Sequence, residues 1–183
     1  ERLGLEWVAF KLDNVNTIAE AIADCDIVYH AAGPFIFTSE PMIKACLATG
    51  THYLDITGEI DVYEKMFSYD EAARKVGIAL IGGVGFDVVP TDCLAKYVAD
   101  QVPGATHLEI GFQALSGVSA GTTKSMIEMM PHGARVRRDG VLKHVTLGAI
   151  QRTLHLPRGT YTGVSIPWGD VSTAYRTTGI PNI

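Results

Sequence analysis

Apolar and polar positions follow one repeating pattern along the chain up to about residue 106. Short apolar runs begin near residues 6, 27, 52 and 78 and alternate with stretches whose apolar positions repeat at helical spacing. A continuous apolar run favours a strand, and a period of 3.6 residues favours a helix. One helix between successive strands is what parallel pairing requires. Residues 1–106 therefore predict an α/β fold with a doubly wound parallel sheet.

The boundaries of these elements follow from turn and capping signals. The expected strands are Glu6–Lys11, Ile27–Ala32, Thr51–Ile56 and Ile78–Ile81. The second is almost continuously apolar, as expected of a strand buried on both faces. Four helices are expected. The first is Thr17–Cys25, with capping-box spacing at its start, and the second is capped by Ser39 and ends at Gly50. The third is a longer helix from about Glu59 to Lys75, and the fourth is Thr91–Gln101.

The pattern changes after Pro103-Gly104. Asp139-Gly140 is a strong signal for a hairpin turn. The expected elements here are strands at His107–Leu115, Val141–Leu147, Arg152–Leu156 and Thr160–Ile166, with a helix near Thr123–Met130. We interpret residues 107–183 as a smaller α+β region with antiparallel strands that serves substrate binding and dimerisation.

Composition narrows the classes of protein that fit. The chain has 183 residues, 47% of them hydrophobic, and can bury a core without disulfides or a metal. Its longest uncharged apolar run, Val76–Phe86, is too short to span a membrane. Three separated cysteines without a CxxC pair, Cys25, Cys46 and Cys93, favour free thiols and a cytoplasmic location. The six histidines form no HExxH or HxxxH motif, so we expect no metal site.

Charge separates the same two regions. Residues 1–106 carry 7 Lys/Arg and 16 Asp/Glu, whereas residues 107–183 carry 8 and 4. The net charge of −5 argues against a nucleic-acid partner. We therefore expect two units with different roles, residues 1–106 and residues 107–183.

A phosphate-binding fingerprint does not occur in this sequence. Neither GxGxxG nor GxxxxGK[ST] is found, although a doubly wound nucleotide domain carries its glycine-rich loop after the first strand. The first four residues read as the end of a helix. We expect the chain to be the middle of a longer protein whose first βαβ unit, with that loop, precedes it.

The strand ends are the candidate binding positions, because ligands of open α/β sheets bind beyond the carboxyl ends of the strands. Three of the four ends contain glycine, which lets a ligand approach the backbone closely. Glycine also serves simply to turn the chain after a strand, but three such loops at one sheet edge favour a cofactor site. The ends are residues 12–13, 31–35, 57–59 and 82–87.

Several motifs resemble one family. Residues 24–35 (DCDIVYHAAGPF), 40–46 (EPMIKAC) and 50–59 (GTHYLDITGE) together resemble the saccharopine dehydrogenase family, whose NADP-binding domain is shared by saccharopine reductases and trans-acting enoyl reductase-like proteins. Residues 85–92 (GFDVVPTD), 121–125 (GTTKS) and 166–170 (IPWGD) are similar to later segments of its reductase-like branch. The resemblance runs from about Val8 to the end of the chain. It implies a Rossmann-like, NADP- or NAD-dependent oxidoreductase that transfers a hydride to or from a small organic substrate.

The resemblance also implies which residues lie along the cofactor. Asp13 is expected near the adenine. The AGPF loop is expected along the ribose and pyrophosphate, and the later loops near the nicotinamide. The implied cofactor-binding residues are Asp13, Ala32, Gly33, Pro34, Phe35, Thr57, Gly58, Gly85 and Phe86.

Residue type alone suggests where proton transfer and substrate binding occur. Glu59, Asp87 and His132 are the candidate catalytic acids or bases. Glu59 equally suits the first turn of a helix, where an acidic residue is favoured. Thr122, Ser125 and Arg135 are the substrate-binding candidates.

The basic cluster at residues 135–138 has two interpretations. Its guanidinium groups are suited to an anionic substrate group, because arginine pairs with carboxylate or phosphate bidentately. A solvated hairpin turn explains the same residues, since Asp139-Gly140 follows directly.

Two other functions stay open. Residues 117–121 (GVSAG) match GxSxG between an expected strand and an expected helix, the pattern of a serine hydrolase with Ser119 as nucleophile. A non-catalytic protein that uses a dinucleotide fold for binding is the other alternative. In either case residues 107–183 are expected to support a homodimer, since exposed strand edges invite pairing.

Overall fold

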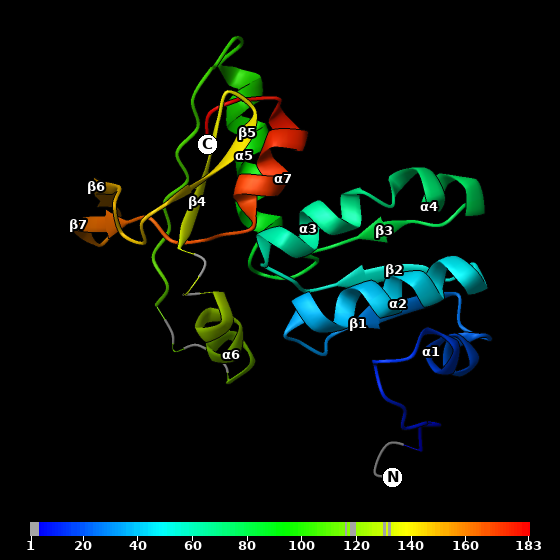
Figure 1. Ribbon diagram of the computed structural model, residues 1–183. Helices are drawn as coiled ribbons and strands as arrows, with labels where there is room; N and C mark the ends of the chain where they lie inside the picture. Colours follow the sequence, from blue (N-terminus) through cyan, green and yellow to red (C-terminus); the bar gives the residue numbers. More distant parts are fainter. Residues whose placement is uncertain (1–3, 116, 118–119, 130, 132) are drawn as a thin grey trace.

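The computed structural model describes residues 4–115, 117, 120–129, 131 and 133–183 (Figure 1). The first region contains α1 (Val15–Ile22), β1 (Ile27–His30), α2 (Phe35–Thr49), β2 (His52–Asp55), α3 (Ile60–Phe67), α4 (Asp70–Val76), β3 (Leu80–Ile81) and α5 (Val89–Gln101). The second contains α6 (Ala120–Met129), β4 (Ala134–Arg138), β5 (Val141–Val145), β6 (Gln151–Leu156), β7 (Gly159–Val164) and α7 (Asp170–Thr178). Among the described residues, no helix is both long and apolar enough to cross a membrane.

Three parallel strands in the order β1-β2-β3 form the sheet of the first region. Val28 pairs with Tyr53, and Tyr53 pairs with Leu80. The connection from β1 to β2 and the connection from β2 to β3 both move in the same direction across the sheet. Right-handed crossovers of this kind place their helices on one face, so α2, α3 and α4 share a side with the main core. That core includes Ile18, Met42, Ile43, Cys46, Tyr53, Tyr63 and Met66.

The other face of the sheet is open. Ile27 and Tyr29 of β1 are 55% and 59% exposed, and Ile81 of β3 is 48% exposed. The expectation of a strand buried on both faces was therefore wrong for β1. Its alternate residues Val28 and His30 point to the covered side, and His30 is buried there with its Nε2 2.9 Å from Thr38 Oγ1.

Several boundaries differ from those that the sequence predicted. Residues 6–11 form no strand, because none of the described strands pairs with them. Asn14, rather than Thr17, caps α1 by accepting from the N–H groups of Asn16 and Thr17. Helix α2 begins at Phe35, so Ser39 lies inside it.

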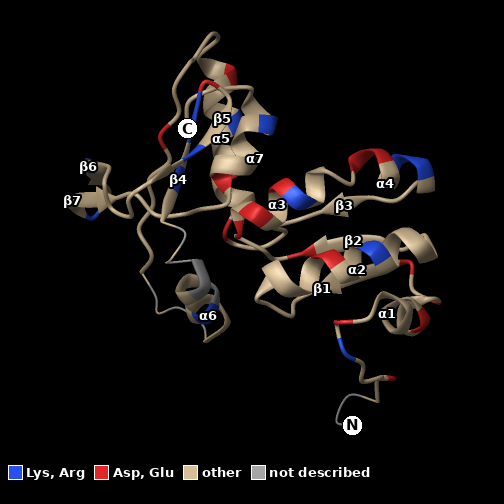
Figure 2. Cartoon of the chain, in the orientation of Figure 1, with Lys and Arg blue, Asp and Glu red and all other residues tan. Residues whose placement is uncertain are grey.

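The single long helix expected after Glu59 is two helices. The chain turns at Ser68-Tyr69, where the Ser68 and Tyr69 N–H groups bond back to Lys65 and Met66. Acidic residues open α4 and basic residues close it, the order that the helix dipole favours (Figure 2). The break lets Met66 and Ala73 both reach the core.

The second region is built from two antiparallel hairpins, β4–β5 and β6–β7. The turn at Asp139-Gly140 is confirmed: both residues have positive φ, 50° and 77°, as a tight hairpin turn requires. Residues 135–138 lie in strand β4 rather than in a solvated turn. Residues 107–115 form no strand, and only His107 makes an isolated bridge, to Asn182.

Helix α7, which sequence analysis did not anticipate, connects the two regions. It packs against α5, α3 and β4. The Thr177 hydroxyl donates to Asp92 Oδ2 of α5 over 2.8 Å. Glu64 of α3 accepts from Arg137 of β4 and from Ser172 of α7. The two regions therefore share a polar interface built on Glu64 and Asp92.

Gly83, after β3, gives a direct test of this packing. Its φ is +70°, and a Cβ placed there would lie 1.8 Å from the Tyr63 hydroxyl oxygen. We expect Gly83→Ala to lower the free energy of unfolding by about 2–4 kcal/mol, from left-handed strain plus overpacking. Gly104 has a similar φ of +79° with nothing within 4 Å of the added Cβ, so Gly104→Ala should cost only about 1 kcal/mol. Urea unfolding measures both, and equal losses would contradict this packing.

Candidate functional site

Asp55, the last residue of β2, fixes the two loops that follow β2 and β3. Its carboxylate is fully buried and accepts from Tyr53 Oη over 2.7 Å, from Thr57 N over 3.0 Å and from Gly83 N over 2.8 Å. Its backbone oxygen also accepts from Val84 N. Hydrogen bonding to several donors is what makes a buried carboxylate tolerable. The carboxyl edge of the sheet is therefore organised from within.

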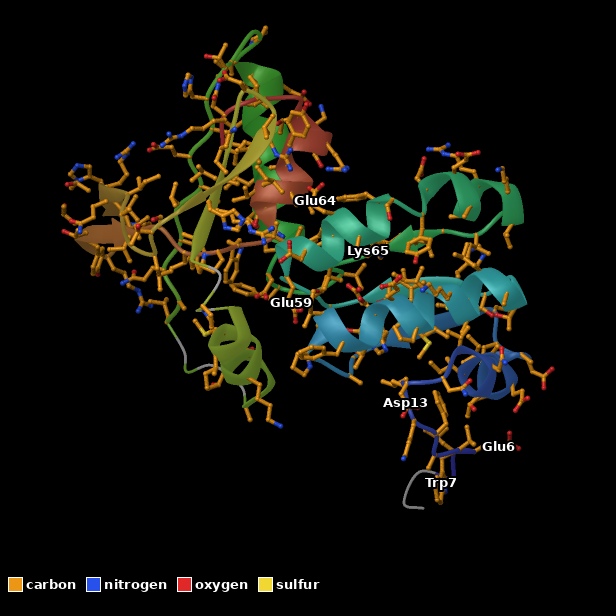
Figure 3. The ribbon with its side chains drawn as sticks, viewed as in Figure 1. Glu6, Trp7, Asp13, Glu59, Glu64 and Lys65 are labelled. Atoms are coloured by element: carbon orange, nitrogen blue, oxygen red, sulfur yellow. The ribbon has the colours of Figure 1, made fainter. Side chains whose placement is uncertain are left out.

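Glu59 links the loop after β2 to the start of α2. Its carboxylate is only 5% exposed, with one oxygen accepting from Phe35 N over 2.9 Å and the other from Ile36 N over 2.7 Å. These N–H groups lie in the first turn of α2, where the helix dipole favours a negative charge. Glu59 does precede α3, as expected, but the helix terminus that it satisfies belongs to α2 (Figure 3).

The loops held in this way differ in what they expose. Ala32 and Gly33 are exposed, Pro34 is half-buried, and Phe35 turns into the protein. Phe86 is 73% exposed beside the half-buried Gly85. Thr57 is fully buried: its hydroxyl accepts from Glu59 N and its backbone oxygen accepts from Tyr63 Oη, so it supports the loop from within.

Asp87 and Gly58 lie against each other at this edge. A Cβ on Gly58 would lie 2.5 Å from Asp87 Oδ2, so the absent side chain makes room for the carboxylate. Burial raises the pKa of Asp87 above its ordinary value. The Asp87 backbone oxygen accepts from Trp168 Nε1 over 2.7 Å, which anchors the loop from the second region. The structure thus brings together Gly58, Glu59, Gly85, Phe86 and Asp87.

The other predicted residues lie elsewhere. Asp13 is exposed in the turn before α1 and lies apart from Glu59 (Figure 3). Thr122 is exposed on α6. Arg135 pairs bidentately with Asp61 of α3, with Nη2 2.8 Å from Oδ2. Ser119, His132 and the side chain of Ser125 lie outside the described residues.

Arg137, in the same basic cluster, is almost fully buried. Its guanidinium donates to Glu64 over 2.9 Å and to the backbone oxygens of Gly140 and Val171. It stacks on the Tyr175 ring, 4.3 Å from the centroid. All these partners belong to the protein, so Arg137 stabilises the junction between the regions.

Asp170 is a buried acid that sequence analysis missed. It is 2% exposed, and neither carboxylate oxygen makes a hydrogen bond of ordinary geometry with any residue that the structure describes. Oδ1 of the neighbouring Asp92 likewise has no hydrogen-bond partner among the residues that the structure describes. Burial raises the pKa of Asp170 to about 6, and the negative charge of Asp92 adds to the effect, although the nearby Thr91 hydroxyl opposes it. Asp170 in the motif IPWGD offered no signal beyond its residue type.

The family model of the saccharopine dehydrogenase NADP binding domain matches residues 2–81. Residues 2–81 therefore correspond to the NADP binding domain of the saccharopine dehydrogenase family. The predicted family, the Rossmann-like fold and the NADP (or NAD) cofactor are thereby confirmed.

Its relatives include oxidoreductases of two kinds. A saccharopine dehydrogenase-like oxidoreductase of Bos taurus is 32% identical over 123 residues, covering 63% of this chain and 29% of that protein. A protein described as a trans-acting enoyl reductase, from Mycobacterium tuberculosis, is 32% identical over 128 residues with the same coverage. A lipid droplet localized protein of Caenorhabditis elegans is 27% identical over 150 residues, 78% of this chain and 35% of that protein. The chain thus spans about a third of the length of these family members.

One solved member has the same fold. Apo saccharopine dehydrogenase (L-Glu forming) of Saccharomyces cerevisiae superposes with a TM-score of 0.54 at 15% identity, covering 87% of this chain and 39% of that one. At this identity the likeness extends to the fold alone.

The residues present fit part of an NADP molecule. The exposed backbone at Ala32-Gly33 permits the close approach of a flat ring or a ribose, whereas Gly58 and Gly85 are half-buried against the side chains of Asp87 and Ile56. The start of α2 is unsuited to a phosphate, because Glu59 already occupies its N–H groups. The fit is therefore to the ribose and nicotinamide portions.

Glu59→Gln tests the hydrogen bonds by which Glu59 links the loop after β2 to the start of α2. A glutamine presents only one acceptor oxygen, so its NH₂ would face an N–H group of α2. We expect the free energy of unfolding to fall by about 1–3 kcal/mol, the usual cost of an unsatisfied buried donor. Glu71→Gln, on the exposed surface of α4, is the matched control and should change it by less than about 0.5 kcal/mol. Urea unfolding of both variants measures these changes. An unchanged free energy of unfolding in Glu59→Gln would contradict the role of Glu59 in capping α2.

Asp170 predicts a specific pH dependence. Its pKa is raised in the folded protein, so the folded state binds the proton more tightly and the free energy of unfolding falls as pH rises from about 4 to about 6. Asp170→Asn has no carboxyl group to titrate, so its free energy of unfolding should not fall over this pH range. At pH 7.5 the variant should exceed the wild type in free energy of unfolding by about 2 kcal/mol, and at pH 4 it should not. Asp24→Asn, at an exposed position, should show no such divergence. Parallel stability curves for Asp170→Asn and wild type across this range would contradict the assignment.

Proposed function

We propose that the protein is an NADP(H)-dependent oxidoreductase that transfers a hydride between the cofactor and a small organic substrate. The observation that carries the proposal is the carboxyl edge of the parallel sheet, where Asp55 and Glu59 hold three loops with exposed backbone at one place. Ligands of open α/β sheets bind at this edge. The match of residues 2–81 to an NADP binding domain supports NADP as the cofactor.

Each loop has a distinct role in this proposal. Ala32, Gly33 and Pro34 lie along the ribose, with Phe35 packed beneath them as support. Gly58, Gly85 and the exposed ring of Phe86 face the nicotinamide. When bound, the nicotinamide supplies the hydride, and the protein supplies orientation and proton handling.

Asp87 is the proposed proton-transfer residue. Its carboxylate has no hydrogen bond to any described side chain, is half-buried, and has a pKa raised by burial, which brings it closer to the working range of a general acid. Glu59 is the weaker candidate, since both its oxygens accept N–H groups of α2. We assign Glu59 to positioning and Asp87 to chemistry.

Substrate binding, assembly and location complete the proposal. Thr122 and Ser125 on α6 stay candidates for substrate contact, whereas Arg135 would first have to leave Asp61. The outer edge of β4 bonds to Ile183, whereas β5, β6 and β7 each have an edge that pairs with no other described strand, which suits a homodimer. Cys25, Cys46 and Cys93 are free thiols, in keeping with a reducing compartment such as the cytoplasm.

Titration with NADPH and NADH, followed by cofactor fluorescence, tests the function. We expect saturable binding of NADPH, and oxidation of NADPH when carbonyl, imine and enoyl compounds are supplied. Asp87→Asn should lower kcat by about 10²–10⁴-fold, the usual contribution of a general acid, with little change in cofactor affinity. Asp100→Asn, on the exposed end of α5, is the control. Failure to bind either nucleotide would overturn the oxidoreductase proposal, and binding without turnover would favour a binding protein.

A further inference from the structure

A cavity of about 720 Å³ lies within the second region, outside the strand-end site. Segments that are distant in the sequence form it: the extended residues 107–112, strand β4, the β6–β7 hairpin with the segment that leads into α7, and residues 182–183. Its volume is within the range of small-molecule sites. None of the residues considered so far as cofactor contacts lines it.

The cavity walls are mostly apolar. Two aromatic rings, Phe112 and Trp168, pack with centroids 4.4 Å apart on one side. Leu154 of β6 lies over two glycines, since Cβ atoms on Gly111 and Gly163 would come within 3.1 and 2.7 Å of its methyl groups. These contacts fix Leu154 as part of the wall.

The charged groups along the cavity are largely neutralised within the protein. Arg135 pairs with Asp61, Arg137 with Glu64, and Arg152 with Glu109 over 2.7 Å. Arg138 also lines the cavity but is exposed, and the buried acid Asp170 lines it as well, which further disfavours an anion. An anionic ligand would have to lose its hydration without gaining an uncommitted cation inside, which is unfavourable. The cavity therefore suits an uncharged molecule.

Trp168 connects the cavity to the strand-end site. It lines the cavity, and its Nε1 donates to the backbone oxygen of Asp87. The next residue, Gly169, packs against Gly58, because a Cβ there would lie 3.3 Å from the Gly58 oxygen. A molecule in the cavity thus shares a wall with the loop that carries Asp87.

We propose that this cavity binds an elongated, uncharged apolar molecule, and that it accommodates the apolar body of the substrate. The second part rests on the proposed function, with Asp87 as the residue next to the reacting group. The substrate class is then an uncharged acyl or alkyl compound, rather than a polycarboxylate amino acid. The apolar walls supply affinity, and the neutralised arginines exclude charged competitors.

The test uses 1,6-diphenylhexatriene, a neutral rod-shaped probe that absorbs where tryptophan emits. In a Trp7→Phe background Trp168 is the remaining tryptophan, so energy transfer from this single donor reports probe bound to the protein. We expect saturable energy transfer that dodecan-1-ol abolishes and that dodecanedioate abolishes at least ten times less effectively. Equal displacement by the dicarboxylate, or no energy transfer, would overturn the proposal.

Two variants locate the probe. Leu154→Lys places a charge in the wall and should weaken probe binding at least tenfold, whereas Val141→Lys, at an exposed position of β5, should change it less than twofold. Leu154→Phe, which fills the cavity without a charge, serves where Leu154→Lys does not fold by circular dichroism. Unchanged probe binding by the folded Leu154 variant would overturn the proposal, as would probe binding that tracks dimer dissociation in light scattering. NADPH titration of the same samples keeps the two proposals separate, because either ligand can bind without the other.

Discussion

The carboxylate of Asp55 accepts hydrogen bonds from the loops after both β2 and β3, and the site depends on this group. A fully buried carboxylate is costly unless several donors satisfy it, and Tyr53, Thr57 and Gly83 do so. Glu59 adds the third loop by accepting two N–H groups of α2. Two acidic side chains therefore hold three backbone segments that would otherwise turn independently at the sheet edge.

Under the proposed function, this arrangement divides the parts of a dinucleotide between different elements. A helix that starts directly after a parallel strand ordinarily offers its N–H groups to a phosphate. In this protein Glu59 supplies that negative charge itself, so the start of α2 serves the structure and leaves the exposed Ala32-Gly33 backbone for a neutral part of the ligand.

The sequence predicted the βα alternation, the family and the Asp139-Gly140 hairpin, because each depends on local periodicity or on a local motif. It did not predict that residues 6–11 lack a strand, since a strand exists only where a partner pairs with it. Long-range contacts set the roles of Glu59, Arg135 and Arg137, which bond to Ile36, Asp61 and Glu64 at separations of 23, 74 and 73 residues. Asp55 ends an apolar strand and could have been flagged as a buried acid, whereas nothing local distinguishes Asp170.

The second region acts on the site through the segment that leads into α7. Trp168 bonds to the Asp87 backbone, Gly169 packs on Gly58, and Asp170 lies buried beside Asp92. Three consecutive residues thus contact the loop after β2, the loop after β3 and helix α5. Because Asp55 and Glu59 fix those loops from the side of the sheet, the position of Asp87 is determined from both regions. The loop that carries the proposed proton donor is therefore held at the junction rather than by either region alone.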